Sequence, residues 1–276
     1  MTRFTALLSA VAAAAISLPG VAGAMTGEKE VQRFTSFGGA CANCELAGRR
    51  LVGAHFIGAN FSGASLVGAD LRNARFVGTV LAKADLSRAD LSDSHMTGAN
   101  FTSANLANVR MRSVEATGTS FAGANLTGAD LADSRAWGAN FTGANLSDAS
   151  FASADLRGAQ LSRVNARGAS FRDAELKGVT MAGGRFERAS FRSADLRGAS
   201  LRGGAFVGAD FHDADLRHAD IAGVDLSGAR GLDQDQLDEA CGDASTRTPR
   251  GLSARACRGP RIVVKIPPAP PPPPRP

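Results

Sequence analysis

The sequence is poor in the residue types that most often carry chemistry. It has no tyrosine, one tryptophan, four histidines and four cysteines among 276 residues. No Ser-His-Asp arrangement and no paired carboxylates stand out, so no catalytic group is identifiable and we expect no metal and no cofactor. We expect the histidines on the solvated surface: His55, His95, His212 and His218. A surface metal site is the alternative for the last two, which lie beside Asp213 and Asp215.

A hydrophobic run long enough to cross a membrane is also missing. Residues 6–18 are apolar but fall short of the ~20 residues that a spanning helix needs. Arg3 precedes the run and small residues follow it up to Ala24, which is typical of a secretory signal. We therefore expect cleavage after Ala24, a periplasmic or secreted protein, and no membrane insertion afterwards. No cysteine follows the run before Cys41, which argues against a lipid anchor.

Strong net charge is absent as well. The formal charge of the whole chain is +5, which is mild for this length. It does not point to nucleic acid, and we expect no nucleic-acid partner.

What the sequence has instead is a period of five. From Leu46 to Leu226 every fifth residue is Leu, Phe, Met, Ile or Ala, with no polar or charged interruption. Two residues before each lies a second column of Ala and other small residues, in which Arg49 is the exception. Neither a helix nor a strand has this period. A chain that turns a corner every five residues does, with one large and one small side chain inward and three facing solvent.

These segments, among them ADLRG, ANFTG, ANLSD and ADLSR, resemble the pentapeptide repeat family. The resemblance implies an all-β fold, a right-handed quadrilateral β-helix with four pentapeptides per coil. Residues 46–230 would then make about nine coils. A strict register leaves no long loops to build a cleft, so we expect a protein that is not an enzyme.

The spacing of phenylalanine supports four sides to a coil. If a coil has 20 residues, like side chains stack at that spacing, and eleven of the twelve Phe in the large column have such a partner. We expect these rings to stack along the axis. Volumes agree too, because the undersized Ala116 and Ala136 are each followed five residues later by a Phe.

Both ends of the repeat are predicted to be capped, because an open coil exposes unpaired backbone. Phe34 and Phe37 of the leader would cover the first coil. At the other end Asp233 and Gln236 fit a capping box that opens a short helix, and Gly242 suits its end. The predicted segments are 1–24 (signal), 25–45 (leader and cap), 46–230 (β-helix), 231–259 (capping helix and disulfide segment) and 260–276 (disordered Pro-rich tail).

The cysteines of an exported chain favour disulfides over thiols. Four cysteines allow three pairings, two of which would join opposite ends of the rod that the resemblance implies. Because a disulfide needs Cα atoms within about 7 Å, the expected pairs are Cys41–Cys44 and Cys241–Cys257. Cys41 falls in the large inward column and Cys44 in the small one, which does not suit a reactive thiolate.

One side of the rod carries two rows of opposite charge. The basic row recurs at spacing 20 and consists of Arg157, Lys177, Arg197 and Arg217, with an acidic residue two positions before each. We expect the rows to neutralise each other on a solvated face. The alternative is a face that contacts a partner, to which the outward-pointing Trp137 would belong.

The leading functional hypothesis is a structural scaffold or protein-interaction module of the periplasm or envelope, with an unknown protein or envelope partner. End-to-end contact between two copies is a further possibility. Two alternatives stay open. One is a thiol-redox protein using Cys41 and Cys44, and the other binds cell-wall or anionic polymer through its Arg-rich coils.

Overall fold

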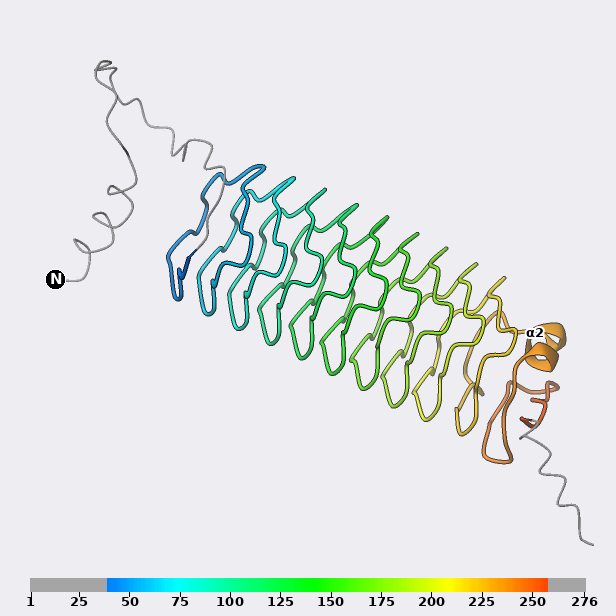
Figure 1. The fold of residues 1–276 in the computed structure, drawn as a ribbon. Helices are drawn as coiled ribbons and strands as arrows, with labels where there is room; N and C mark the ends of the chain where they lie inside the picture. Colours follow the sequence, from blue (N-terminus) through cyan, green and yellow to red (C-terminus); the bar gives the residue numbers. More distant parts are fainter. Residues whose placement is uncertain (1–38, 258–276) are drawn as a thin grey trace, which may run out of the picture. The chain divides into compact units, whose positions relative to one another are not determined.

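The computed structural model describes residues 39–257. The predictions for the signal, for Phe34 and Phe37 of the leader and for the Pro-rich tail lie outside the described residues. Within them the chain winds into stacked coils (Figure 1). Parallel bridges join every fifth residue to the one 20 positions later, from Ala40–Asn60 to Asp210–Arg230. The predicted coil length of 20 residues is therefore confirmed, and the regular register already begins at residue 40.

The corners explain why these bridges stay isolated instead of forming longer strands. The backbone N–H three residues after each large residue donates to that residue's carbonyl, as Ala54 does to Leu51 at 3.1 Å. Every fifth residue from 43 to 223 has a φ between +54° and +71°, as the third residue of a type II turn requires. Four of the five residues in each repeat thus belong to a turn, and one remains for the bridge.

The turn geometry predicts the effect of a substitution at Ser153, an exposed residue with φ +56°. We expect Ser153→Gly to raise the free energy of unfolding by ~0.5–1 kcal/mol, because glycine adopts positive φ without strain. Ser153→Val is expected to lower it by ~1–2 kcal/mol, because a β-branched residue is strained there. Chemical denaturation measures both. Equal stability of the two variants would contradict a left-handed conformation at this corner.

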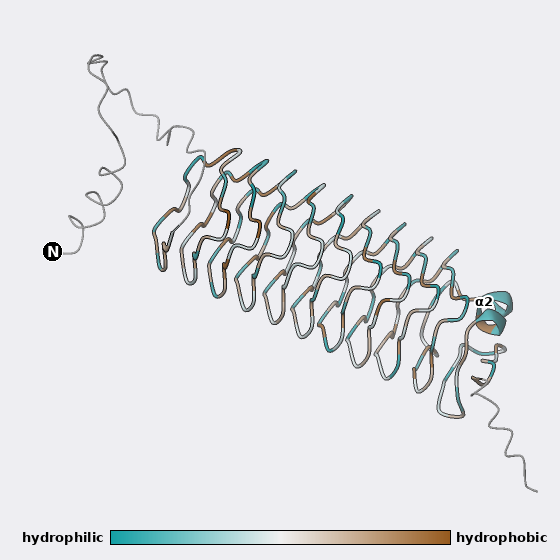
Figure 2. Cartoon of the chain, viewed as in Figure 1, coloured by the Kyte–Doolittle hydropathy of each residue, from teal (hydrophilic) through white to brown (hydrophobic). Residues whose placement is uncertain are grey.

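The interior consists of the two predicted inward columns. The large and small residues between Leu51 and Leu226 are almost all buried, and hydrophobic and hydrophilic positions alternate along each coil (Figure 2). The predicted phenylalanine stacks are confirmed, since all seven pairs at spacing 20 lie with ring centroids 4.9–5.3 Å apart and nearly parallel planes. One such column runs from Phe151 to Phe211.

Glycine enters the small column where a ring needs its space. A Cβ on Gly184 would lie 2.5 Å from Phe186 Cε2, and one on Gly204 would lie 2.7 Å from Phe206 Cε2. Alanine is too large at these two positions unless the ring moves. In these two repeats the small glycine therefore makes room for the large phenylalanine two residues later.

The polar residue between the two inward columns has a structural role in many repeats. The backbone ladders and turns use the other N–H groups of a repeat, and the one left over belongs to the residue after the large one. An Asp or Asn two positions earlier accepts from it, as Asn100 does from Thr102 at 2.9 Å and Asp90 from Ser92 at 3.0 Å. An exposed turn thus becomes fully hydrogen-bonded, which explains the frequent Asp and Asn of the repeat.

The register ends in a short helix, α2 (Gln234–Glu239), which is the one helix within residues 39–257. Asp233 is its N-cap and forms the capping box with Gln236. The side chain of Gln236 also donates to the carbonyls of Phe211 (3.0 Å) and Ala214 (2.8 Å) in the last coil. The Ala214 carbonyl is one that a further coil would otherwise pair, whereas the Phe211 carbonyl also accepts from Ala214 N–H within the turn. No helix in the described range is long and apolar enough to span a membrane.

The prediction that Gly242 stops the helix is wrong. The C-cap is Ala240, in extended conformation. The chain instead returns to the ladder at Cys241, which pairs with Asp220. Gly242 pairs with Ala256, and a Cβ on it would lie 2.8 Å from Thr246 Oγ1. Close packing of the Thr246 and Ala254 side chains against this residue, and not helix termination, therefore explains the glycine.

Candidate interaction surface

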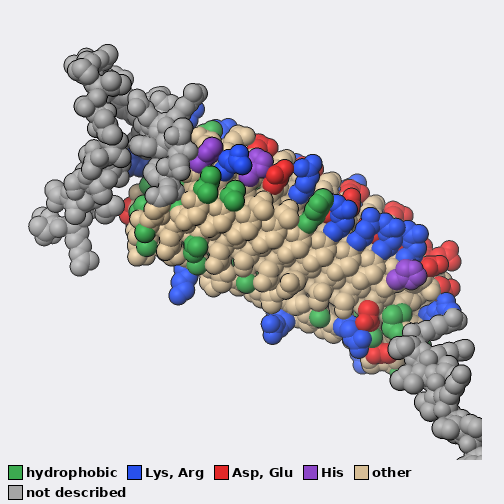
Figure 3. Space-filling model, viewed as in Figure 1, with side chains coloured by type: hydrophobic (Ala, Val, Ile, Leu, Met, Phe, Trp, Pro, Cys, Tyr) green, Lys and Arg blue, Asp and Glu red, His purple; other side chains and the backbone are tan. Residues whose placement is uncertain are grey.

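One side of each coil carries the residues that the sequence singled out, and we call it the Trp137 face. It has an outward row in mid-side and a second row next to the corner. The mid-side row is His55, Arg75, His95, Glu115, Arg135, Asp155, Glu175, Asp195 and Asp215. The corner row is Ile57, Val77, Thr97, Thr117, Trp137, Arg157, Lys177, Arg197 and Arg217. Figure 3 shows Lys and Arg side chains gathered along one edge of the stack.

The basic part of the corner row is paired throughout. Arg197 Nη2 lies 2.7 Å from Asp195 in its own coil, and its Nε lies 3.5 Å from Asp215 in the next. Lys177 likewise bridges Glu175 (3.8 Å) and Asp195 (3.1 Å). Four basic and four acidic side chains thus form a continuous ladder of ion pairs. This geometry favours the neutralised face over a positively charged polymer site.

Trp137 begins this ladder. Its side chain is half-exposed, and the guanidinium Cζ of Arg157 lies 4.5 Å from its ring centroid. Burial raises the pKa of Asp155, but hydrogen bonds from Arg157 and Trp137 outweigh burial, so this pKa lies below its usual value. The ring is therefore held in place by two neighbours while part of it faces solvent, which suits a contact residue.

The ladder makes stability sensitive to acid. A hydrogen bond from Arg197 lowers the pKa of Asp195 to about 2. Because the folded pKa lies below the unfolded value of ~3.9, the stabilisation is complete above pH ~4 and is lost as the pH falls towards 2. We expect Asp195→Asn to lower the free energy of unfolding by ~1 kcal/mol at pH 5 and hardly at all at pH 2, after allowance for solvent screening. Denaturation at both values measures this, and an equal loss at both would refute it.

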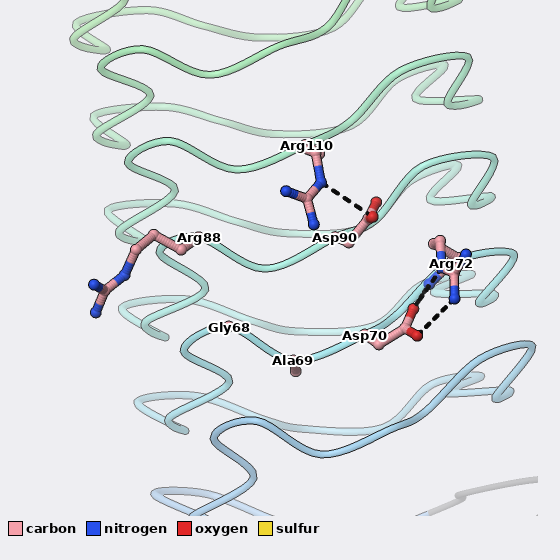
Figure 4. Close-up of a pocket in the computed structure, with 7 residues that line it drawn as sticks. All are labelled: Gly68, Ala69, Asp70, Arg72, Arg88, Asp90 and Arg110. Carbon is pink, nitrogen blue, oxygen red and sulfur yellow. Dashed lines mark hydrogen bonds and ion pairs between the residues drawn. The ribbon is translucent and has the colours of Figure 1, made fainter.

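A shallow hollow lies on another side, near the start of the stack (Figure 4). Arg72 binds Asp70 through two contacts of 2.8 Å, and Arg110 Nε lies 3.1 Å from Asp90. Arg88 points away from both carboxylates. The hollow is lined by Gly68, Ala69, Asp70, Arg72, Arg88, Asp90 and Arg110. The hydrogen bond from Arg72 is the largest influence on Asp70 and lowers its pKa, so this carboxylate stays ionised and is unsuited to act as a general acid.

The cysteines lie at the two ends of the described coils. Cys41 and Cys44 form a disulfide with Cα atoms 5.4 Å apart, and Cys44 is buried. Cys241 and Cys257 form the other, with Cα atoms 4.5 Å apart. Both cysteine pairs therefore serve as covalent links in this structure. Within residues 39–257 one cluster has three potential metal ligands, and it consists of Asp220 and the disulfide-bonded Cys241 and Cys257.

The histidines do not converge. His95 Nδ1 lies 2.8 Å from Glu115, and His212 contacts Asp210 in its own repeat. His218 occupies a corner position with φ +60°. The alternative metal site at His212 and His218 therefore finds no cluster of three ligands in the described range.

The repeats match a known protein family. The pentapeptide repeats family matches in eight overlapping copies, at residues 41–78, 74–112, 94–133, 111–148, 124–163, 154–192, 169–204 and 194–230. No curated protein matches the sequence.

Solved structures give further similarity. HetL, a pentapeptide repeat protein involved in heterocyst differentiation regulation in the cyanobacterium Nostoc sp. strain PCC 7120, is 27% identical, with 74% of this chain and 92% of HetL covered and a TM-score of 0.42. A pentapeptide repeat protein from the Arabidopsis thaliana thylakoid lumen is 38% identical, over 38% of this chain and 70% of that one, with a TM-score of 0.26. QnrB1, a plasmid-mediated fluoroquinolone resistance protein, is 20% identical over 76% and 92%, with a TM-score of 0.39.

Proposed function

Because the chain belongs to the pentapeptide repeat family, we propose that it is a non-enzymatic scaffold that binds a protein partner in the periplasm or envelope. In this proposal it is a right-handed, four-sided rod of about nine coils, closed at its C-terminal end by α2. The observation that carries the proposal is the unbroken register from the Ala40–Asn60 bridge to the Asp210–Arg230 bridge. Such a register presents long parallel rows of side chains and has no inserted loop to enclose a substrate.

The proposed location rests on two features. The signal predicted at residues 1–24 would direct export, and the cysteines of the described range are all in disulfides. Disulfides persist in oxidising compartments such as the periplasm. The two features are independent, because one concerns the leader and the other the folded coils.

The alternatives have less support. A thiol-redox role needs an accessible, low-pKa cysteine, whereas Cys44 is only 8% exposed, Cys41 is partly buried, and the two are joined in a disulfide. Binding of anionic polymer needs free positive charge, whereas the row of Arg157, Lys177, Arg197 and Arg217 is paired with carboxylates.

Site-specific photo-crosslinking in the producing cell tests this proposal. We would place p-benzoylphenylalanine at Lys177 on the Trp137 face, and at Val207 on another side as the control, since both positions are at least partly exposed. We expect adducts with an envelope protein from position 177 and none from 207, in a chain whose N-terminus is Met25. Recovery of an uncleaved chain in the cytoplasm, or adducts of equal yield from both positions, would refute the proposal.

A further inference from the structure

The Trp137 face also carries an unusual amount of exposed apolar surface. In residues 39–257 five large hydrophobic side chains are exposed, and three of them share the corner row: Ile57 (50%), Val77 (37%) and Trp137 (43%). The row between Val77 and Trp137 holds Thr97 and Thr117, which are uncharged. We call these five side chains the apolar strip: three are large and hydrophobic, and the two threonines among them carry no charge. The charged ladder begins in the coil after Trp137.

The corner beside this strip is unusually smooth. Its next position is glycine in eight successive coils, Gly58 to Gly198 at spacing 20, and a Cβ on any of them would meet nothing within 4 Å. On the other sides of the coils the same turn position is glycine in some repeats and Lys, Arg, Asp, Asn or Ser in others, with the same positive φ. The turn geometry alone therefore does not require glycine here, and its effect is to leave the apolar strip open to a flat neighbour.

The charged residues beside the strip are arranged so that two copies of the chain could pair opposite charges. Arg75 is exposed and has no ion pair in the described part of the chain. Glu115, two coils further on, is 43% exposed and lies 2.8 Å from His95 and 3.3 Å from Arg135. The coil between them carries His95 and Thr97, so a two-fold axis through that coil exchanges the positions of Arg75 and Glu115.

We propose that two copies of this chain pair side by side and antiparallel through this strip, about a two-fold axis at the coil of Thr97. In this register Ile57 of one copy lies against Trp137 of the other, and Val77 against Thr117. Arg75 of each copy faces Glu115 of the other, which gives two equivalent ion pairs, as two-fold symmetry requires. Glycine corners face glycine corners, so the two backbones can approach closely.

The register is selective. A shift by one coil in one direction sets Ile57 opposite Thr117 and Arg75 opposite His95. A shift in the other direction keeps an apolar contact, Val77 opposite Trp137. It also sets Ile57 opposite Arg157 and Arg75 opposite Arg135, which buries a charge and opposes two like charges. The proposed alignment avoids this opposition and sets Arg75 opposite Glu115.

The contact is small and the pairing is weak. Five coils at the ~4.8 Å spacing of neighbouring strands span ~24 Å. A typical stable interface buries ~800 Å² per partner, which as a square patch would be ~28 Å long. We therefore expect a dimer that dissociates on dilution, with half-association in the range of ~10–100 μM.

Sedimentation equilibrium of the disulfide-bonded full chain at pH 8, with tryptophan fluorescence, tests the pairing. Trp137 is the sole tryptophan and the chain has no tyrosine, so its emission reports this contact alone. We expect a blue shift as the protein concentration rises from ~1 to ~200 μM. Arg75→Glu and Glu115→Lys should each weaken association about tenfold or more, and the double variant should restore it to within about threefold.

The control is Val207→Asn, which removes an exposed hydrophobic side chain from a different side and should leave association unchanged. A monomer at all concentrations would overturn the proposal, including a monomer whose Trp137 emission is already blue-shifted because the leader covers the strip. Association that the charge reversals do not change would overturn it too, because the contact would then lie elsewhere, for example end to end. None of these outcomes bears on envelope crosslinks from position 177.

Discussion

Replacing Phe171 by alanine is expected to lower the free energy of unfolding by about 3–5 kcal/mol. The side chain is fully buried, and its ring lies 5.2 Å from that of Phe151 and 5.1 Å from that of Phe191, nearly parallel to both. No other chain segment can collapse into the space, because each coil is held by bridges to its two neighbours. The loss therefore includes both the transfer of the ring and the cavity that it leaves.

The location of the destabilised coils in Phe171→Ala is as informative as the change in free energy of unfolding. In a solenoid each repeat contacts only its neighbours, so a central defect weakens the coils around it most. Hydrogen exchange of Phe171→Ala should show protection lost mainly between residues 151 and 191, with the first coils nearly unaffected. Val207→Ala is the control, because Val207 is 55% exposed, and it should change stability by less than ~0.5 kcal/mol. Uniform loss of protection along the stack would contradict nearest-neighbour packing.

A charge in the small inward column is expected to prevent folding, and a charge two residues away is expected to be harmless. Ala154 is fully buried, and Asp at this position would be a carboxylate without a partner in a dense interior. We expect Ala154→Asp to cost more than ~4 kcal/mol, enough to abolish folding of a marginally stable protein. The yield of folded protein that resists protease measures this.

Ala152→Asp provides the matched test, because it adds the same side chain two residues earlier, at an outward, half-buried position of the preceding repeat. We expect a yield and a midpoint of denaturation close to those of the unchanged protein. If both variants fold, or if neither does, the five-residue division into inward and outward positions is wrong at this repeat.

The inward columns could be predicted from the sequence because packing depends on size and polarity, which the sequence states directly. The stack of Phe101, Phe121 and Phe141 follows from their spacing alone, and the structure places these rings 4.9–5.3 Å apart. The ion pairing of the two charged rows was also expected from the sequence, because residues at a spacing of 20 stack into rows and the two rows are neighbours on one side of the coils.

Outward residues were harder to interpret, because their roles depend on which backbone groups remain unpaired. The frequent Asp and Asn of the repeat read as generic surface residues until the structure showed a bond such as that from Thr102 N–H to Asn100. The prediction for Gly242 was wrong because a glycine near a helix end often terminates the helix, whereas here the side chains of Thr246 and Ala254 pack closely against it. The apolar strip joins Ile57, Val77 and Trp137, which lie 20 and 60 residues apart and are solitary in the sequence.

The central claim is that the chain works through its outer rows, with its cysteines as structural links. The most direct test is the rate at which the Cys41–Cys44 disulfide of the folded protein exchanges with a glutathione buffer near −200 mV, followed by alkylation and mass analysis. A structural disulfide is thermodynamically resistant to such a buffer, and burial of Cys44 also slows attack. We predict no labelled cysteine within hours, and four labelled cysteines only after unfolding with reductant. Rapid labelling of Cys41 or Cys44 in the folded protein would contradict the account and favour a redox function.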